Sequence, residues 1–433
     1  MKIVVFLATL LLLIPAVCSA ALLEGRILEG HIIDASTGKP VPDSVVTVGN
    51  IAVAGDVAGD FKINIGSANL NPNILARAPG YRAASFTPAA AAQSKNVFAL
   101  VPFTPHALYL SVYGIASKPL RAGAFDIIRN GGANALVVDV KSDRGLLTYP
   151  SGISLAQTTG ARKLTLVHSL REVVDNAHQQ GIYMIARIVT FKDANLGAAR
   201  PDLAVHLANG ALFRDREGLT WTDPYQFEVR AYNISIAVEA AKAGFDEVQF
   251  DYVRFPDASA KLVFTGPTSE SGRVSVLNKF LTEARTALVP FNVFEAVDIF
   301  GYVGWNLNDT GIGQQLESLV TLVDYLCPML YPSGFKFGIP GHKSPMATNE
   351  DIYDIIRLTL ENCVRRTGAN PKKFRPWLQA FRDYAFGGKV FGPGEVNAQI
   401  RGAYDAQSDG WILWNPHNRY SSTGLGDIAK SRP

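Results

Sequence analysis

The pattern of apolar and polar positions changes once along the chain, early on. From residue 25 to residue 101, short apolar runs alternate with Gly-rich and Pro-containing turn signals. The runs Val45–Val48 and 61–65 are short enough, and alternate clearly enough, to predict half-buried strands. Many short strands joined by tight turns predict a small antiparallel β-sandwich over 25–101. The proline-flanked stretch 102–105 is then expected to be a linker.

Beyond this linker, apolar strand patterns alternate with helical patterns. The run Ala135–Lys141 is almost continuously apolar and β-branched, which is typical of a parallel strand covered on both faces. Phe227–Ala243 has helical spacing, and Gly244 is placed to end that helix. Eight strands, each followed by a helix or loop, predict a (β/α)8 TIM barrel over residues 106–425. The strands are predicted at 106–115, 135–141, 182–189, 244–255, 291–300, 322–331, 375–381 and 410–414.

A doubly wound open sheet is the competing fold. It would require a Gly-rich phosphate-binding loop after an early strand, and the sequence contains none. The predicted organisation is therefore multi-domain, with a TIM barrel preceded by a small all-β sandwich.

Composition and charge indicate where in or outside the cell the protein is located, and they exclude several classes of partner. Residues 1–20 combine a basic Lys2, an apolar stretch and small residues up to Ala20, which predicts a cleaved signal peptide and a periplasmic or extracellular protein. Lipid attachment through Cys18 is the less favoured alternative, because the residues before it fit the lipid-attachment pattern poorly. No second apolar span follows, so no membrane span is expected after cleavage. With a net charge of +3 and no Lys/Arg cluster, no nucleic acid is expected as a partner.

Cysteine and histidine usage gives no sign of a metal site. After signal cleavage, Cys327 and Cys363 remain. An exported chain could join them, but the apolar run around Cys327 favours a buried thiol. The 7 histidines are scattered, with no helical pair and no Cys-x-x-Cys motif. Neither a metal nor another cofactor is expected.

One predicted strand places polar residues on a single face. Glu247, Gln249 and Asp251 alternate with apolar neighbours, and buried polar groups are costly unless they line a site or have partners. A proline soon afterwards ends the strand, which leaves Asp251 near its C-terminal end, where barrel enzymes carry their chemistry. The alternative is a structural aspartate held by Arg254 or Arg187.

Polar and aromatic residues also occur at the ends of the other predicted strands. Side chains that converge on one rim from several strands are what a barrel active site requires. The aromatic residues among them suit stacking against the apolar faces of sugar rings. The rim residues are Asp139, Lys141, Arg187, Asp251, Asp298, Tyr331, Gln379, Trp414 and Asn415.

The first segment resembles a known accessory domain. Its stretches 30–42, 59–61 and 78–81 are similar to the carboxypeptidase regulatory-like β-sandwich. This resemblance implies a non-catalytic module over residues 25–101 and no particular ligand.

The second segment resembles the bacterial glycoside-hydrolase family with a TIM-barrel domain. Five motifs occur in order, which makes the likeness specific over about residues 106–420. It implies a glycosidase that acts on a polysaccharide of the cell envelope or its surroundings. The motifs are 244–256, 297–302, 327–332, 375–381 and 410–415.

Glycoside hydrolysis requires two carboxyl groups, one protonated and one ionised. Asp251 and Asp298 end adjacent predicted strands, so we expect both to face one substrate. We expect Asp251 to act as nucleophile or base, with its charge stabilised by Arg187 or another cation. Asp298 is then the expected acid, because apolar surroundings raise a carboxyl pKa; its alternative role is to cap a loop. Asp139 is the substitute for either role.

The remaining rim residues are expected to bind the sugar. Their alternative role is hydrogen bonding within the rim itself. Glu247 is expected to lie too deep in the barrel to take part. The expected substrate-binding residues are Lys141, Arg187, Tyr331, Gln379, Trp414 and Asn415.

Two other functions stay open. A barrel that binds sugars without turnover, with the sandwich as an adhesive module, would be favoured if the acid at position 298 were missing. A deacetylase or peptidase would require a His/Asp metal cluster or a Ser with a His base, and the sequence shows no such spacing.

Overall fold

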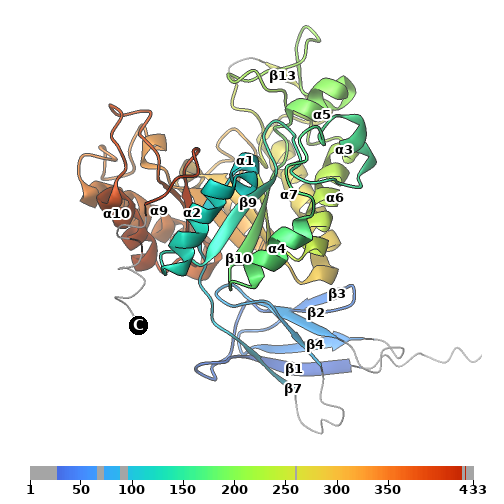
Figure 1. Cartoon of the computed structure of the whole chain (residues 1–433), viewed down its shortest axis with the longest axis vertical. Coiled ribbons are helices and arrows are strands. Elements are labelled where there is room, and N and C mark those ends of the chain that lie inside the picture. Colours follow the sequence, from blue (N-terminus) through green and yellow to red (C-terminus); the bar gives the residue numbers. More distant parts are fainter. Residues whose placement is uncertain (1–26, 66–72, 88–95, 259–260, 422–424, 426–433) are drawn as a thin grey trace, which may run out of the picture.

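The chain folds into a pair of small β-sheets followed by a closed β/α barrel (Figure 1). The computed structural model describes residues 27–65, 73–87, 96–258, 261–421 and 425. The predicted signal peptide, with Cys18, lies outside the described residues.

The first two sheets share one hydrophobic core. In β4, Phe61 and Ile63 are buried whereas Lys62 and Asn64 are exposed, as expected for a strand with one face on a core. Strand order is β4-β1-β7 in one sheet and β3-β2-β5-β6 in the other, and every pair is antiparallel except β1–β7, which is parallel. The strands are β1 (Ile27–Asp34), β2 (Val45–Val48), β3 (Ile51–Ala54), β4 (Asp60–Asn64), β5 (Ile74–Arg77), β6 (Ala84–Phe86) and β7 (Asn96–Leu100).

The second part is the predicted TIM barrel. Eight parallel strands close in the order β8-β9-β10-β12-β14-β15-β16-β17, which confirms the predicted fold class. The strands are β8 (His106–Leu110), β9 (Ala135–Lys141), β10 (Tyr183–Val189), β12 (Glu247–Asp251), β14 (Phe294–Phe300), β15 (Tyr325–Met329), β16 (Trp377–Gln379) and β17 (Trp411–Trp414).

Helices cover the outside of this barrel. In α4, for example, Leu170, Val174 and Ala177 are buried whereas Arg171 and Glu172 are exposed to water. The α-helices are α1 (Val112–Ala116), α2 (Lys118–Arg129), α3 (Ser154–Thr158), α4 (Leu170–His178), α5 (Ala194–Ala199), α6 (Phe227–Ala243), α7 (Glu270–Leu288), α8 (Leu316–Leu322), α9 (Asn349–Thr367) and α10 (Pro393–Asp405). Short 3-10 turns are η1 (Pro201–Leu203), η2 (Val289–Phe291), η3 (Gly301–Gly304), η4 (Pro332–Gly334) and η5 (Pro371–Lys373).

Alternation along the strands separates an interior core from an outer one. On β9, Ala135 and Val137 pack inside the barrel, and Leu136 and Val138 pack outside against the helices. All seven residues of β9 are buried, which explains its continuous apolar sequence. The polar residues that follow the same inward alternation therefore point into the barrel or onto its rim.

The predicted strand 106–115 is shorter in the structure. It ends at Leu110 because Ser111 begins α1: the Ser111 side chain accepts a hydrogen bond from the backbone N–H of Gly114. A serine side chain at this position satisfies a helix N–H that would otherwise lack a partner. The chain therefore turns away from the barrel one residue after β8.

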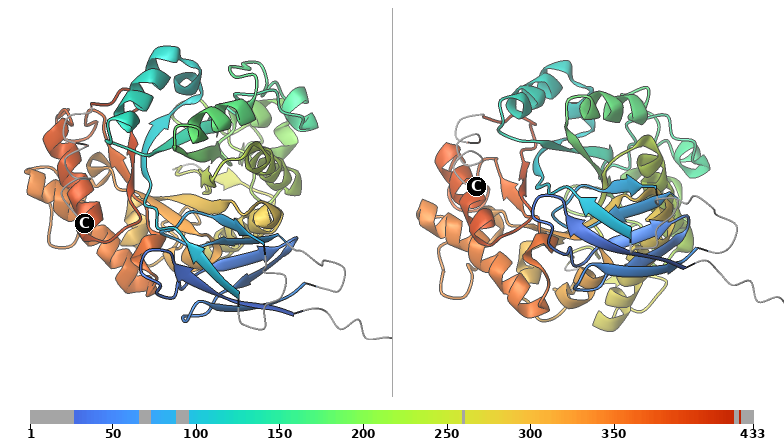
Figure 2. Two further views of the ribbon diagram at one scale, coloured as in Figure 1. Left: turned by 60° about the horizontal axis from the view of Figure 1, so that its bottom comes forward. Right: turned by 90° about the horizontal axis from the view of Figure 1, so that it is seen from below.

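The two sheets cover the N-terminal end of the barrel. Arg77 of β5 forms an ion pair with Asp324, which directly precedes β15, at 3.1 Å. Asn292, just before β14, donates to the backbone carbonyls of Ala76 and Ala84 at 3.3 and 3.1 Å. Seen from below, the sheets lie over this end of the barrel (Figure 2). The opposite, C-terminal rim is left clear of them.

The predicted linker 102–105 is packed rather than free. The backbone N–H of Phe103 donates to Gly80 at 2.9 Å, and its ring lies 5.2 Å from that of Tyr183 in the barrel. The two parts are thus joined by contacts as well as by the chain.

Loops extend the opposite rim. β11 (His206–Leu207) pairs with β13 (Leu262–Val263), and this small ribbon stands with α5 at the far end of the molecule from the sheets (Figure 1). Within the described ranges, no helix combines the length and the apolar character that crossing a bilayer demands. Cys327 and Cys363 are both free, buried thiols.

Candidate active site

Three carboxylates surround one arginine inside the C-terminal rim. Arg187 of β10 donates from Nη1 to Asp139 of β9 at 2.5 Å. Its Nε donates to Asp251 Oδ2 at 3.1 Å, and its Nη2 contacts the same oxygen. Asp298 Oδ2, on β14, lies 3.8 Å from Nε. The four strands are consecutive in the barrel wall, so inward alternation brings these side chains to one place.

Asp251 is the last residue of β12 and is held from two sides. Besides Arg187, the backbone N–H of Tyr252 donates to its Oδ1 at 2.5 Å. Tyr252 has a φ of 53°, a left-handed conformation that is uncommon outside glycine. The backbone therefore bends sharply directly after the carboxylate. Such strained residues are concentrated at functional sites.

Asp298 lies one layer deeper. The residue is 1% exposed, and Oδ1 accepts a hydrogen bond from the indole N–H of Trp377 at 2.7 Å. Its Oδ2 has no hydrogen-bond partner among the described residues. Burial, with the negative charge of Asp251 in addition, raises the pKa of the Asp298 carboxyl well above its ordinary value. The geometry therefore favours a protonated Asp298 beside Asp251.

Asp139 is held by hydrogen bonds on both oxygens. Tyr109 of β8 donates its hydroxyl to Oδ2 at 2.6 Å, and Arg187 binds Oδ1. Burial raises the pKa of the Asp139 carboxyl, although Arg187 and Tyr109 act in the opposite direction. With both oxygens already bonded, Asp139 orients Arg187 rather than facing solvent.

A pocket of about 140 Å³ opens above this cluster. Asp251 is the one member of the three carboxylates that lines it; Asp139 and Asp298 lie behind the wall. Tyr331 and Trp414 form part of the wall and stack on each other with ring centroids 5.6 Å apart. The lining residues are Arg187, Asp251, Tyr252, Arg254, Phe300, Met329, Tyr331, Trp377 and Trp414.

The spacing of Asp251 and Asp298 is bounded by Arg187. Both Oδ2 atoms lie within 4 Å of its Nε, so they are at most about 7 Å apart. In glycosidases, carboxyl separations of about 5 Å accompany retention and about 6.5–9.5 Å accompany inversion. This upper bound is compatible both with the retaining separation and with the short end of the inverting range.

Lys141 is not part of this pocket. The pairing of β9 with β10 shifts register between Arg187 and Ile188, so that Lys141 lies opposite Ile188 on the outer face. There its Nζ donates to the carbonyls of Val189 and Thr190 and pairs with Asp193 at 2.8 Å. It is completely buried, so the expected sugar-binding role does not fit its location.

Gln379 also lies outside the pocket wall. It is fully buried, accepts from the backbone N–H of Ser333 at 3.1 Å and donates to the Ser333 hydroxyl at 2.7 Å. These bonds fix the start of the loop that follows Tyr331. Its role in the structure is therefore to position that loop.

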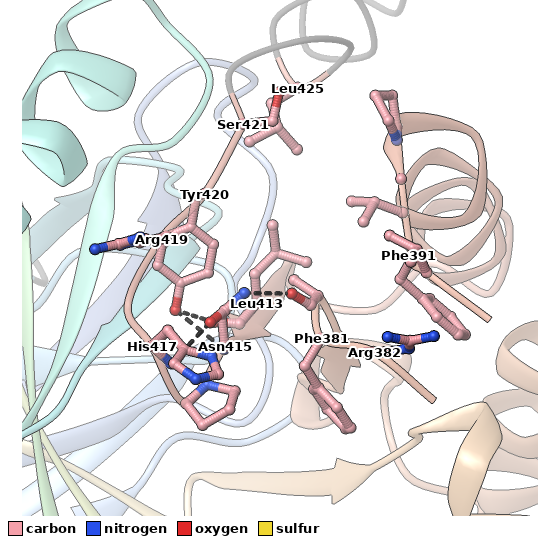
Figure 3. A pocket seen from close by; sticks show the side chains of 16 residues that line it. Phe381, Arg382, Phe391, Leu413, Asn415, His417, Arg419, Tyr420, Ser421 and Leu425 are labelled. Atoms are coloured by element: carbon pink, nitrogen blue, oxygen red, sulfur yellow. Dashed lines mark hydrogen bonds between the residues drawn. The ribbon is translucent and has the colours of Figure 1, made fainter. Parts of the chain in front are cut away.

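Asn415 belongs to a second pocket, of about 430 Å³, between the loop after β16, α10 and the segment after β17. Its side chain donates to the carbonyl of Ala380 at 2.6 Å and accepts from the backbone N–H of His417 at 2.8 Å. Asn415 and Tyr420 lie on one side of this pocket, and Arg382 and Phe391 lie across from them (Figure 3). Among the described residues no carboxylate lines it, so the candidate site is assigned to the smaller pocket.

Glu247 lies deep in the barrel, as the sequence predicts. Arg375 donates to both of its carboxylate oxygens, at 2.9 and 2.7 Å, and Tyr183 donates at 3.1 Å. The pair is fully buried toward the N-terminal end, away from the pocket.

Several residues of the site were not singled out from the sequence as site residues, and three of them bear directly on the carboxylates or on the charge of the pocket. Tyr109 lies on the inward face of β8, and its position in the alternation is a signal that could have identified it. Trp377 lies on β16, and its indole N–H donates to Asp298. Arg254 was considered only as a partner for Asp251, and it lines the pocket instead.

Comparison with solved structures places the barrel among known folds. A hypothetical protein from Ruminiclostridium thermocellum ATCC 27405 is 36% identical over 44% of this chain and 96% of its own, with a TM-score of 0.39. The glycoside hydrolase domain of PgaB (BpsB) from Bordetella bronchiseptica is 13% identical, with 76% of this chain and 100% of that domain covered and a TM-score of 0.56. The second likeness supports the barrel fold. Among curated proteins, none matches the chain.

A family model fits the barrel from end to end. It is described as "Putative glycosyl hydrolase domain" and matches residues 107–420, from the start of β8 to the segment after β17. The match includes every carboxylate and arginine of the cluster around Arg187. The chain belongs to this glycosyl hydrolase family.

Proposed function

We propose that this protein hydrolyses glycosidic bonds of a polysaccharide at the pocket above Arg187. The observation that carries the proposal is the pair Asp251 and Asp298, within about 7 Å of each other, with one carboxylate at the pocket wall beside an arginine and the other buried. A bond between sugars is cleaved by one ionised and one protonated carboxyl group. The arginine beside Asp251 favours the ionised form there, and burial favours the protonated form of Asp298.

Asp251 is the group that meets the substrate. Arg187 and the N–H of Tyr252 orient its carboxylate, so it is placed to attack the anomeric carbon or to activate a water molecule. The stacked rings of Tyr331 and Trp414 offer a flat apolar wall for the sugar.

Asp298 supplies the proton in this mechanism. Its raised pKa keeps it protonated, but Trp377 lies against it and its side chain is almost fully buried. We therefore propose that substrate binding displaces the Trp377 side chain far enough to expose Oδ2. Exclusion of water from a protonated acid before binding also keeps its pKa high.

The substrate is proposed to lie outside the cytoplasm. The predicted signal sequence supports export, and the sheets cover only the barrel end that is opposite the pocket. This arrangement supports an accessory role for the sandwich, as a spacer or anchor near an envelope or extracellular polysaccharide.

One observation favours a second candidate. Of the three carboxylates around Arg187, Asp251 alone lines the pocket, so a barrel that holds a sugar against Tyr331 and Trp414 without cleaving it also fits. In that case the cluster around Arg187 would serve binding alone.

The test is release of reducing ends from a panel of purified envelope and extracellular polysaccharides. Wild type is compared with Asp251→Asn, Asp298→Asn and Asp139→Asn, and with Asp126→Asn, an exposed aspartate of α2, as control. We expect Asp251→Asn and Asp298→Asn each to lower the rate by at least about 100-fold, as removal of a catalytic acid or base does. Circular dichroism checks that the variants fold.

The two candidates give different results. Sugar binding that persists in wild type without any release of reducing ends would establish the binding barrel and reject the hydrolase. Full activity in Asp298→Asn would remove Asp298 from the mechanism and leave Asp139 as the substitute acid.

A further inference from the structure

Arg254 brings a positive charge to the pocket, and in the part of the chain that the structure describes it has no carboxylate partner of its own. Arg187, by contrast, contacts Asp139 and Asp251, and Lys192 pairs with Glu217 at 2.8 Å. For Arg254, no carboxylate of the described chain lies within the 4.0 Å of an ion pair. Its charge is therefore not neutralised by direct contact, although it lines the same wall as Asp251.

Aromatic rings hold this guanidinium in place. Its central carbon lies 4.8 Å from the ring centroid of Trp221, 4.9 Å from that of Tyr252 and 4.6 Å from that of Phe300. One N–H donates to the carbonyl of Phe255 at 3.0 Å, and the group makes no other hydrogen bond with described residues. The three rings come from three separate segments of the rim, so the group is fixed before any ligand arrives.

The surroundings of Arg254 favour a bound anion. Burial lowers the pKa of its guanidinium, and attraction from Tyr252, Asp251 and Asp257 at longer range does not offset this effect. A charge in poorly solvated surroundings gains most from an opposite charge that binds directly.

We propose that the sugar bound beside Asp251 carries an anionic group, a carboxylate or a sulfate, which Arg254 binds. The proposal rests on the proposed function, because it takes the pocket as the sugar site. The planar guanidinium matches two oxygens of either group with parallel N–H donors, whereas a neutral hydroxyl offers one. The substrate class is then an acidic polysaccharide, rich in uronic acid or sulfated sugars.

The experiment measures binding, so that it does not depend on turnover. Oligosaccharides from polygalacturonate, alginate, hyaluronate and chondroitin sulfate are titrated into the full chain carrying Asp251→Asn. Each is paired with its carboxyl-reduced or desulfated counterpart. We expect an acidic chain to bind about 10- to 100-fold more tightly than its neutral counterpart, with the difference shrinking as salt is added.

Substitutions of arginine residues test whether the preference for acidic oligosaccharides depends on Arg254. Arg254→Gln is expected to remove it while binding of the neutral counterpart persists, and Arg254→Lys to keep part of it. Arg129→Gln, which removes a charge from an exposed residue of α2 that lines neither this pocket nor the second one, is the control and is expected to leave the preference intact. If carboxyl reduction weakens binding, the recognised group is a carboxylate; if desulfation weakens binding, it is a sulfate.

Several results would overturn the inference. They are a neutral glycan as the tightest ligand, equal binding of acidic and neutral counterparts, no binding of any acidic chain, or a preference that survives Arg254→Gln. An acidic preference without release of reducing ends in wild type rejects the hydrolase and keeps this inference. If the wild type cleaves neutral chains alone, and Arg254→Gln leaves this cleavage unchanged, the hydrolase is kept and the inference about Arg254 is rejected.

Discussion

At the scale of single residues, Asp251 and Asp298 show how one arginine can serve two different carboxyl groups. Asp251 touches Arg187 through two nitrogens and borders the pocket, whereas Asp298 is 3.8 Å from Nε and leaves Oδ2 without a hydrogen-bond partner in the described chain. Ionising a buried carboxyl next to another negative charge is unfavourable. Burial and the nearby charge of Asp251 therefore keep the proton on Asp298, and Arg187 is too far from it to offset them.

The raised pKa of Asp298 predicts a pH-dependent stability. In the unfolded chain this carboxyl ionises near pH 4, but the folded protein resists ionisation, so the wild type loses stability as pH rises from that point toward the folded pKa. Asp298→Asn cannot ionise and keeps an oxygen that accepts from Trp377. We expect the free energy of unfolding of the variant, relative to wild type, to increase between pH 4 and pH 8. Denaturant titrations across this range measure it.

The exposed Asp126→Asn serves as the reference, since its difference from wild type is expected to stay nearly constant with pH. A flat difference for Asp298→Asn as well would show that Asp298 ionises normally. In that case it would not be the acid.

At the scale of elements, the junction of α6 and β12 places Asp251. Gly244 ends α6 with a φ of 100°, and β12 begins three residues later. The short turn is possible because glycine adopts this backbone conformation without the steric cost that a Cβ brings. Five strand residues then carry the chain to the rim.

Gly244→Ala is expected to lower the free energy of unfolding by about 1–2 kcal/mol, the cost of a left-handed conformation for a residue with a Cβ. Space is not the cause, because an added Cβ would meet its nearest atom, on Val174, at 3.6 Å. The matched control is Gly123→Ala within α2, where the exposed position is open, and we expect about 0.5–1 kcal/mol of stabilisation. Urea unfolding measures both; changes of the same sign would contradict this account.

At the scale of the whole molecule, the sheets and the barrel share a buried ionic contact. Arg77 and Asp324 are each 4% exposed, and Arg285 approaches Asp324 from the other side at 3.2 Å. Burial alone would raise the pKa of the Asp324 carboxyl, but Arg77 and Arg285 lower it to about 2. The sandwich is thereby tied to the end of the barrel that does not bind the proposed substrate.

Arg77→Ala is expected to destabilise the protein by about 3 kcal/mol, because Asp324 loses one of two cations while still buried. The loss should shrink as pH falls from about 4 toward 2, since Asp324 then takes up a proton and no longer needs the partner. Thermal and denaturant unfolding measure it. Lys62→Met, in an exposed pair with Glu29, is the control, with an expected change below about 0.5 kcal/mol. Equal effects would mean that the interface does not depend on this pair.

Much of the fold follows from local patterns. Strand β9 and helix α6 have the predicted bounds, because hydrophobic periodicity and helix-ending glycines act within a few residues of sequence. The parallel pairing of β1 with β7 was not predicted, because strands so far apart in sequence carry no local sign of their direction.

The sequence by itself determined that eight strands form a barrel and that Asp139, Arg187, Asp251 and Asp298 point inward, because alternation along a strand fixes which face a side chain takes. Only the tertiary structure decided which of these reach the pocket. A register shift turned Lys141 outward, the Trp377 side chain closed over Asp298, and three rings gathered around Arg254. Each depends on depth along neighbouring strands and on contacts between distant segments, which a one-dimensional pattern does not contain.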